Sequence, residues 1–133
     1  MEQTIDKIYS STDYRSLTDP ERTIFKAVVT TLRERGLFSE ADVPVIAGYA
    51  RNVVLARTAA RDVQKAGVVI KFQDRGCDKW KENPAVAVMH KAQNAYEATA
   101  LKLGLTPTGR RRMKTMEAAP KSALEQFEEE GDD

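Results

Sequence analysis

The chain has 133 residues, enough for one domain with tails; 41% of them are hydrophobic and 31% charged, and the formal net charge is +1. One cysteine and one histidine exclude an intrachain disulfide, a cysteine-based zinc site and a metal site with two histidines. No segment approaches the roughly 20 apolar residues that span a bilayer, and the N-terminus lacks the apolar run of a signal peptide, so we expect a soluble intracellular protein.

The small net charge conceals an uneven distribution of charge along the chain. Residues 1–67 hold ten Lys or Arg against nine Asp or Glu, and residues 68–116 hold ten against four. Residues 117–133 hold one, Lys121, against seven acidic residues. A polyanion would therefore be attracted by the middle section and repelled by the tail.

The N-terminal part begins with a polar stretch and continues with a helix. Residues 1–17 are rich in Ser, Thr and Asp and have no helical period, so we expect a flexible arm, with or without a short helical stretch. Thr18, Pro20 and Glu21 have the spacing of a helix start with a capping box. Apolar residues then recur at helical spacing until Gly36, which predicts the first firm helix.

A second, longer helix is predicted between Ser39 and Gly67. At about 1.5 Å per residue it would be roughly 40 Å long. So small a domain cannot bury every side of a helix of that length, and we expect some of its apolar residues to contact a neighbouring subunit. The candidates for this oligomer interface are Val45, Tyr49, Val54 and Leu55.

Residues 68–80, VVIKFQDRGCDKW, differ in character from the helices on either side. Val, Ile and Phe favour extended chain, and Asp74, Arg75 and Gly76 favour a turn. This pattern predicts a short β-hairpin or an irregular excursion. A two-stranded hairpin alone is marginally stable, so we expect it to pack against another part of the molecule.

Two more helices are predicted in the C-terminal half. Asn83 and Pro84 start the first of them, and Gly104 ends it. Thr106 and Pro107 repeat the cap-plus-proline device and start a short helix through GRRRMK. The predicted fold class is mainly α: a small helical domain of three to four helices, with the hairpin or excursion between the second and third long helices. We assign residues 1–17 to the arm, 18–116 to the helical core and 117–133 to an acidic tail.

The cations of the middle section are candidates for contacts with phosphate, because such contacts need Arg and Lys and release counterions. The alternatives are a solvated charged face, pairing of the three consecutive arginines with the acidic tail, and a nuclear localisation signal. For Trp80 we favour an anchor that holds the hairpin over a base-stacking role, because duplex DNA offers no free base. The candidate DNA-binding residues are Arg110, Arg111, Arg112, Lys114, Lys71, Arg75, Lys79 and Lys81.

The residues offer little for an enzyme. The chain has no P-loop motif, so nucleotide hydrolysis of that kind is not expected. We interpret Cys77 as an unreactive loop thiol and His90 as a surface residue rather than a base. The acidic residues are scattered or lie in the tail, without a convincing metal-binding set. We therefore expect no catalysis, no metal and no cofactor.

The order of these signals is more specific than any one of them. The chain reads LRERGLFSEADVPVIAGYA, a long helix, KAGVVIKF, GCDKWKENPAV, a further helix and LGLTPTGRRRMK. In this order it resembles the small terminase subunits of tailed double-stranded DNA phages, in the family with a C-terminal LGLTP-basic signature. The resemblance covers roughly residues 19–113 and is carried mainly by GLFSEAD, by the NP before the third helix and by LGLTPTGRRR.

The resemblance implies a DNA-packaging adaptor without catalysis of its own, acting in the cytoplasm of the host cell. It further implies closed homo-oligomeric rings that bind viral double-stranded DNA and deliver it to the large subunit, which carries the ATPase and nuclease. A ring repeats every cation around its axis, so that weak phosphate contacts add up. Sequence choice would come from DNA bending or from a helix-turn-helix within residues 22–57.

The acidic tail has a predicted role of its own in this scheme. Two apolar residues three apart lie among its carboxylates, which favours docking on a partner, expected to be the large subunit. The candidate partner-docking residues are Leu124, Phe127, Glu128 and Glu129. The rival interpretation of the whole chain is a helical protein-interaction or regulatory module that does not bind nucleic acid.

Overall fold

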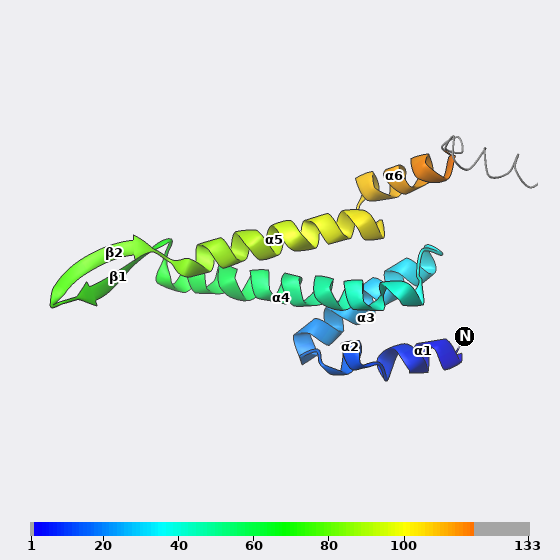
Figure 1. Cartoon of the computed structure of the whole chain (residues 1–133), viewed down its shortest axis with the longest axis horizontal. Helices are drawn as coiled ribbons and strands as arrows, with labels where there is room; N and C mark the ends of the chain where they lie inside the picture. The colour runs from blue at the N-terminus through cyan, green and yellow to red at the C-terminus, as the bar shows by residue number, and fades with distance from the viewer. Residues whose placement is uncertain (1, 119–133) are drawn as a thin grey trace, which may run out of the picture.

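The computed structural model describes the backbone of residues 2–118 and the side chains of residues 5–115. Within this range the chain is mainly helical and has one two-stranded antiparallel sheet, which confirms the predicted fold class. Figure 1 shows the elements in chain order. They are α1 (Glu2–Tyr9), α2 (Thr12–Arg15), α3 (Asp19–Glu34), the 3-10 helix η1 (Glu40–Asp42), α4 (Val43–Ala66), β1 (Val69–Asp74), β2 (Cys77–Glu82), α5 (Pro84–Leu103) and α6 (Pro107–Ala118).

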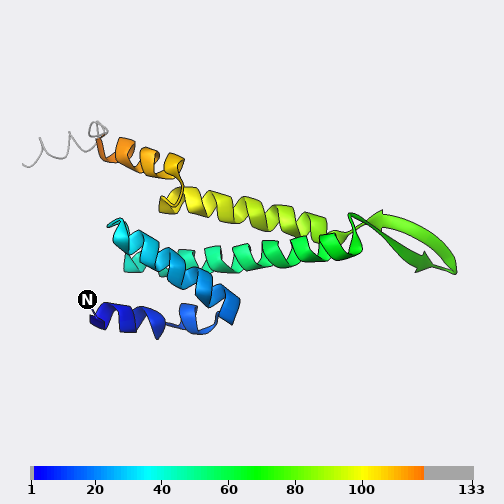
Figure 2. The same cartoon turned by 180° about the vertical axis from the view of Figure 1, so that it is seen from behind.

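Helices α4 and α5 lie side by side in opposite directions and form the long axis of the molecule (Figures 1 and 2). The 24 residues of α4 correspond to roughly 36 Å at about 1.5 Å per residue, close to the predicted length. The β1–β2 hairpin extends from one end of this helix pair, and α6 leaves the other end (Figure 1). The pair therefore separates two parts of the chain that are only about 25 to 50 residues apart in sequence.

The hydrophobic core lies at one end of the pair, where α1, α2 and α3 pack on the N-terminal half of α4. Its largest fully buried side chains are Phe25, Val29, Leu32 and Ile46, and Leu103 from the end of α5 joins the same cluster. The outer half of α4 has α5 beside it, and the side chains buried there are small: Ala56 and Ala59 of α4 and Ala92 of α5. Small residues let the two helix backbones approach closely but bury little apolar surface. This half of the molecule, which we call the outer arm, is only two helices thick.

Residues 2–17 differ from the predicted flexible arm. They form α1 and α2, and Ile8, Tyr14 and Leu17 are 3%, 8% and 4% exposed within the core. The ring centroids of Tyr14 and Phe25 lie 5.2 Å apart. Ile5, Ile8 and Tyr9 do stand at helical spacing (i, i+3, i+4), but the pattern is short and easily overlooked among the polar residues, because the chain bends at Ser11, whose side chain accepts a hydrogen bond from the Tyr14 N–H. The prediction of an arm was wrong for this reason.

The predicted helix boundaries are largely confirmed, because they rest on local hydrogen bonds. The Thr18 N–H donates to Glu21 Oε1 at 2.9 Å, as expected of a capping box. Gly36 and Gly104 end α3 and α5 with positive φ of 69° and 74°, which glycine adopts without strain. Ser39 starts the one-turn η1 rather than α4 itself, and its hydroxyl accepts from the Ala41 N–H at 3.3 Å.

The base of the hairpin is held by Asn83, the buried polar residue at 4% exposure that caps α5. Its Oδ1 accepts from the Ala85 N–H at 3.0 Å, and its Nδ2 donates to the Gly67 carbonyl at 3.0 Å. The Asn83 N–H also donates to the Val68 carbonyl at 2.7 Å. One side chain thus joins the end of α4 to the start of α5.

The hairpin itself confirms one prediction and contradicts another. Strands β1 and β2 pair from Val69 opposite Glu82 to Asp74 opposite Cys77, and both residues of the connecting turn, Arg75 and Gly76, have positive φ, typical of a type I′ turn. Trp80, however, is 66% exposed, so it is not the predicted anchor. The hairpin projects beyond the end of the helix pair (Figure 1).

Substitution of Ile8 tests whether α1 belongs to the core. Ile8→Ala should lower the free energy of unfolding by roughly 2–4 kcal/mol, because it removes a buried side chain. Asp6→Ala, at an exposed position of the same helix, should change it by less than about 0.5 kcal/mol. Urea unfolding followed by circular dichroism measures both. A near-zero effect of Ile8→Ala would show that α1 does not pack on the core in solution.

Candidate nucleic-acid interface

The eight predicted DNA-binding residues fall into two groups at opposite ends of α5 (Figure 1). The hairpin group is Lys71, Arg75, Lys79 and Lys81, and the α6 group is Arg110, Arg111, Arg112 and Lys114. The 20 residues of α5 separate the groups by about 30 Å. A single chain therefore does not bring them together into one surface.

The hairpin group is largely neutralised by carboxylates of the same hairpin. Lys71 Nζ lies 3.0 Å from Asp78 Oδ2, and Lys79 Nζ lies 2.9 Å from Asp74 Oδ2. Both pairs are diagonal neighbours across the two strands. With Glu82, the strands and turn carry three carboxylates against four cations. Because exposed ion pairs are worth at most about 1 kcal/mol, a phosphate could displace them, but the local field is weak.

Aromatic rings lie beside two of the hairpin cations. Lys71 Nζ lies 5.9 Å from the centroid of the Trp80 ring, and Lys81 Nζ lies 5.0 Å from that of Phe72. These are cation–π distances, of modest strength at an exposed site. The hairpin thus presents an aromatic ring beside an ammonium group at two places along its strands.

The α6 group has a different electrostatic environment. Among the side chains that the structure describes, no carboxylate forms an ion pair with any of its four cations. Arg111 and Arg112 are exposed, and Arg110 donates from Nη1 to the Leu105 carbonyl at 3.2 Å. Three of the cations, Arg110, Arg111 and Lys114, line one shallow hollow together with Pro107. Of the two groups, α6 is the stronger candidate for phosphate.

Two glycines determine how α6 sits against the rest of the chain. Gly104 ends α5 in the left-handed conformation, and a Cβ there would lie 2.6 Å from Met113 Sδ of α6. Gly109 lies in the first turn of α6, where its N–H donates to Thr106 Oγ1 at 3.0 Å. A Cβ on Gly109 would collide with the backbone carbonyl of Leu101. The LGLTPTG segment therefore packs α6 tightly on the end of α5.

The predicted oligomer-interface residues differ in availability. Val45 and Leu55 are 43% and 47% exposed on α4, whereas Tyr49 and Val54 are half-buried. The Tyr49 ring makes an edge contact with Tyr96 of α5, with centroids 6.0 Å apart. Burial raises the pKa of Tyr49, the neighbouring Tyr96 raises it further, and Arg57 lowers it. Tyr49 therefore holds α5 within the chain, and Val45 and Leu55 are the residues free to meet a neighbour.

Sequence reasoning missed three other exposed apolar residues. Val88 of α5 is 40% exposed, and Val68 and Val69 at the base of the hairpin are 56% and 52% exposed. The sequence places Val88 in a helix and the two other valines in an extended segment, but neither periodicity nor propensity indicates which face lacks a cover. Together with Leu55 they lie along the outer arm.

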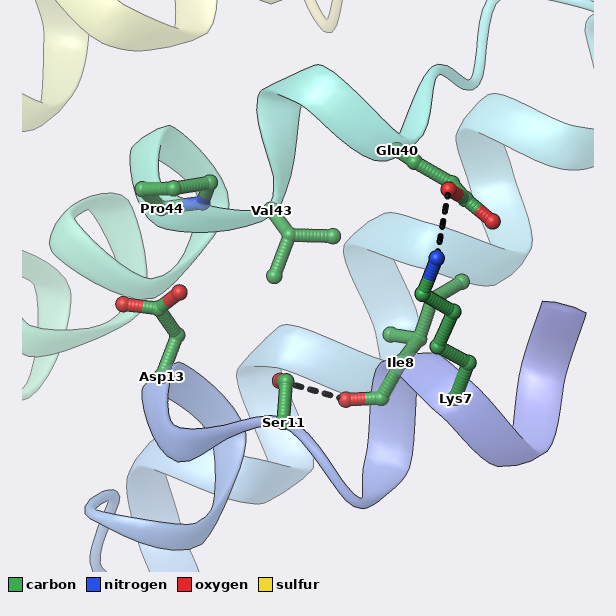
Figure 3. A pocket seen from close by; sticks show the side chains of 7 residues that line it. All are labelled: Lys7, Ile8, Ser11, Asp13, Glu40, Val43 and Pro44. Atoms are coloured by element: carbon green, nitrogen blue, oxygen red, sulfur yellow. Dashed lines mark hydrogen bonds and ion pairs between the residues drawn. The ribbon is translucent and has the colours of Figure 1, made fainter.

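A pocket of about 220 Å³ lies between α1–α2 and the start of α4 (Figure 3). Its rim carries Lys7 and Glu40, whose charged atoms are 3.9 Å apart, and its Ser11 hydroxyl donates to the Ile8 carbonyl at 2.6 Å. A hydroxyl whose proton is donated to a backbone carbonyl is not activated as a nucleophile. The described residues also contain no cluster of His, Cys, Asp and Glu that could hold a metal ion.

Cys77 and His90 are both exposed. Leu124, Phe127, Glu128 and Glu129 lie outside the described residues. None of the helices that the structure describes is long and apolar enough to cross a membrane.

Alanine substitution of two glycines tests the packing of α6. Gly109→Ala should destabilise the contact by roughly 1–3 kcal/mol and speed hydrogen exchange of the α6 amides, because the new Cβ meets a backbone oxygen. Gly48→Ala is the matched control: Gly48 lies within α4 with nothing within 4 Å of the added atom. It should stabilise the fold by up to about 1 kcal/mol and leave α6 exchange unchanged. Identical α6 exchange in wild type and Gly109→Ala would contradict the close contact.

Comparison with known proteins agrees with the order of these elements. A model of the family described as phage terminase, small subunit, matches residues 22–120. No curated protein and no solved structure gives a match. The matched segment starts within α3 and takes in the helix pair, the hairpin and the basic helix α6. Because it covers most of the sequence, the chain belongs to the phage terminase small subunit family.

Proposed function

We propose that this protein is the DNA-recognition adaptor of a phage packaging motor. In this proposal, copies of the chain assemble as a ring, bind viral double-stranded DNA and present it to the large terminase subunit, in the cytoplasm of the host cell. Membership of the family implies a role in phage DNA packaging. The observation that carries the finer proposal is the α6 group, four cations without a described carboxylate partner on a helix held in a defined position.

Phosphate binding by α6 follows from the charge of the helix and its exposure. Consecutive arginines point about 100° apart around a helix, so Arg110, Arg111 and Arg112 cover more than half of its circumference. Arg110, Arg111 and Lys114 lie within about 100° of one another around the helix, so a duplex along that side of α6 would meet all three. Such contacts give affinity that does not depend on base sequence.

Assembly of several copies is supported by what the outer arm leaves exposed. Leu55, Val88 and the valines at the base of the hairpin are exposed large apolar residues on a part of the molecule that is only two helices thick. A two-stranded hairpin is marginal on its own and would gain stability from a neighbour. A ring would also repeat the α6 group around its axis, which multiplies weak phosphate contacts.

Base readout by a helix-turn-helix in residues 22–57 is disfavoured by the local structure. The connection between α3 and α4 spans residues 35–42 and includes η1, longer than the 3–4-residue turn of that motif. A recognition helix contacts bases with its N-terminal residues. The N-terminal turn of α4 consists of Val43, Pro44, Val45 and Ile46, and two of these residues, Val43 and Ile46, are buried. We therefore propose that sequence choice arises from DNA bending around the assembly.

Non-catalytic action and recruitment of the large subunit complete the proposal. The family is that of a packaging component, and the chemistry of packaging would lie with the large subunit. We propose that the large subunit binds the tail through Leu124, Phe127, Glu128 and Glu129.

Leu124→Ala with Phe127→Ala should weaken this complex in a pull-down with purified large subunit; undiminished capture would refute the contact.

The salt dependence of duplex binding tests the role of α6. Each phosphate contact that a substitution removes should reduce the slope of log affinity against log salt concentration by about 1, so Arg111→Ala with Arg112→Ala should reduce it by up to about 2. Lys91→Ala with Lys102→Ala removes the same charge from exposed positions of α5 and should leave the slope nearly unchanged. Fluorescence anisotropy with a labelled duplex at about 50 to 200 mM salt measures both. Equal slopes in all three proteins would count against α6 as the interface.

The mass of the assembly tests the role of the outer arm. Leu55→Glu should lower the mass in solution, because it places a charge in an apolar contact between copies. Gln64→Glu adds the same charge nine residues away on the opposite side of α4, at an exposed position, and should preserve the mass. Light scattering distinguishes the two. A wild-type monomer that does not bind DNA at low salt would favour the rival function, a helical protein-interaction module.

A further inference from the structure

A hollow of about 190 Å³ lies where the end of α3 meets α6. It is lined by two apolar side chains, Leu37 and Met113, which we call the floor, and by three cationic side chains, Arg35, Arg110 and Lys114. Arg35 Nη1 donates to the Gly104 carbonyl at 3.4 Å, and Arg110 Nη1 to the Leu105 carbonyl at 3.2 Å. These hydrogen bonds hold two guanidinium groups beside the floor. The hollow is thus a built apolar site with three cations around it.

The positive charge around this hollow has no ion-pair partner among the side chains of residues 5–115, and the side chain of Glu117 of α6 lies outside that range. No described carboxylate forms an ion pair with Arg35, Arg110 or Lys114. Cations gathered around an apolar floor favour an occupant that combines an apolar side chain with flanking carboxylates, since such an occupant satisfies both features. A bare phosphate would use the cations and leave Leu37 and Met113 uncovered.

The sequence that follows α6 has this chemistry. Residues 119–133 read APKSALEQFEEEGDD, with Leu124 and Phe127 among Glu125, Glu128, Glu129 and Glu130. The described chain ends at Ala118, one helical turn beyond Lys114 of the hollow. The nine residues from Ala118 to Phe127 span up to about 30 Å when extended, so Phe127 can return to the hollow of its own chain. The short connection gives a high effective concentration.

We propose that the acidic tail docks in this hollow of the same chain, with Phe127 on the Leu37–Met113 floor and the glutamates against Arg35, Arg110 and Lys114. Arg110 and Lys114 also belong to the α6 surface proposed for phosphate. The docked tail therefore competes with DNA and acts as a built-in inhibitor of non-specific binding. This regulatory consequence rests on the proposed function, whereas the docking does not. Capture of the tail by the large subunit would free α6 at the moment when DNA is delivered.

Tryptophan fluorescence of the full chain tests the docking without DNA. Trp80 is the only tryptophan and is exposed, so Trp80→Phe with Phe127→Trp moves the signal to the tail. We expect emission at shorter wavelength than in the urea-unfolded chain, lost when Arg35→Glu and Lys114→Glu are added. Arg61→Glu with Lys65→Glu, at exposed positions of α4, is the charge-matched control and should retain the shift. Emission at the solvent-exposed wavelength, or a shift that survives Arg35→Glu with Lys114→Glu, would overturn the proposal.

A mixing experiment decides which copy supplies the tail. The reporter chain, with Trp80→Phe and Phe127→Trp, also carries Arg35→Glu and Lys114→Glu. It is mixed with a Trp80→Phe, Phe127→Ala chain, whose hollow is intact and whose tail lacks the aromatic ring. If the tail docks within its own chain, the reporter in this mixture keeps the emission wavelength of a solvent-exposed tryptophan. A restored blue shift would show that the hollow binds the tail of a neighbouring copy and would overturn the same-chain assignment.

Duplex binding tests the regulatory consequence. A variant with four tail glutamates changed to Gln should bind the duplex about three- to tenfold more tightly at low salt, as expected if the form with an undocked tail is roughly a third to a tenth of the wild-type population. The four residues are Glu125, Glu128, Glu129 and Glu130. The control variant changes the net charge by the same amount at exposed positions elsewhere and should bind the duplex with a smaller gain. It carries Asp6→Asn, Glu34→Gln, Asp62→Asn and Glu97→Gln. An equal gain in duplex affinity in both variants would show that net charge alone causes it, and would refute inhibition by the docked tail. No binding by any variant would refute the proposed function, while the fluorescence result would still decide the docking.

Discussion

The antiparallel packing of α4 on α5 determines where every other feature of this molecule lies. Small side chains such as Ala56, Ala59 and Ala92 allow the two helices to run together beyond the core, at the cost of little buried apolar surface. The hairpin consequently projects from one end and α6 from the other (Figure 1). The core at the inner end, the Tyr49–Tyr96 contact between the helices and the Asn83 hydrogen bonds at the outer end hold the two helices together.

The distribution of carboxylates, more than that of cations, distinguishes the two charged regions. The hairpin and α6 each carry four cations, yet the hairpin pairs Lys71 and Lys79 with its own aspartates, and α6 has no described carboxylate partner. Unpaired cations on one exposed helix produce a stronger field than the same number neutralised locally. Because the family acts in DNA packaging, this contrast makes α6 the stronger candidate for contact with DNA phosphates.

The position of α6 also connects the two proposals. Its glycine-packed contact with α5 holds Arg110 and Lys114 between an outward surface suited to phosphate and a hollow suited to an acidic, apolar segment. Two anionic occupants that need the same cations cannot be bound at full strength together. Competition of this kind would let a small protein with little net charge control when it holds DNA.

The local features of the fold could be predicted from the sequence because they depend on neighbours within a few residues. The Thr18–Glu21 capping box, the Asn83 cap, Gly104 at the end of α5 and the Arg75–Gly76 turn all follow from backbone preferences and short-range hydrogen bonds. The order of these signals was enough to identify the family, as the match over residues 22–120 confirms.

Other features depend on elements that are distant in sequence, and only the tertiary structure decided them. Ile8 and Leu17 enter the core because the chain bends between two short helices, and Trp80 is exposed because the hairpin extends past the helix pair. The hollow joins Arg35 to α6 across more than 70 residues. The sequence by itself therefore determined the helices, the turn and the family, whose signals are local and ordered along the chain. The packing of α4 on α5 and of α6 on α5 decided which charges are paired and which surfaces are open, because those depend on which distant segments meet.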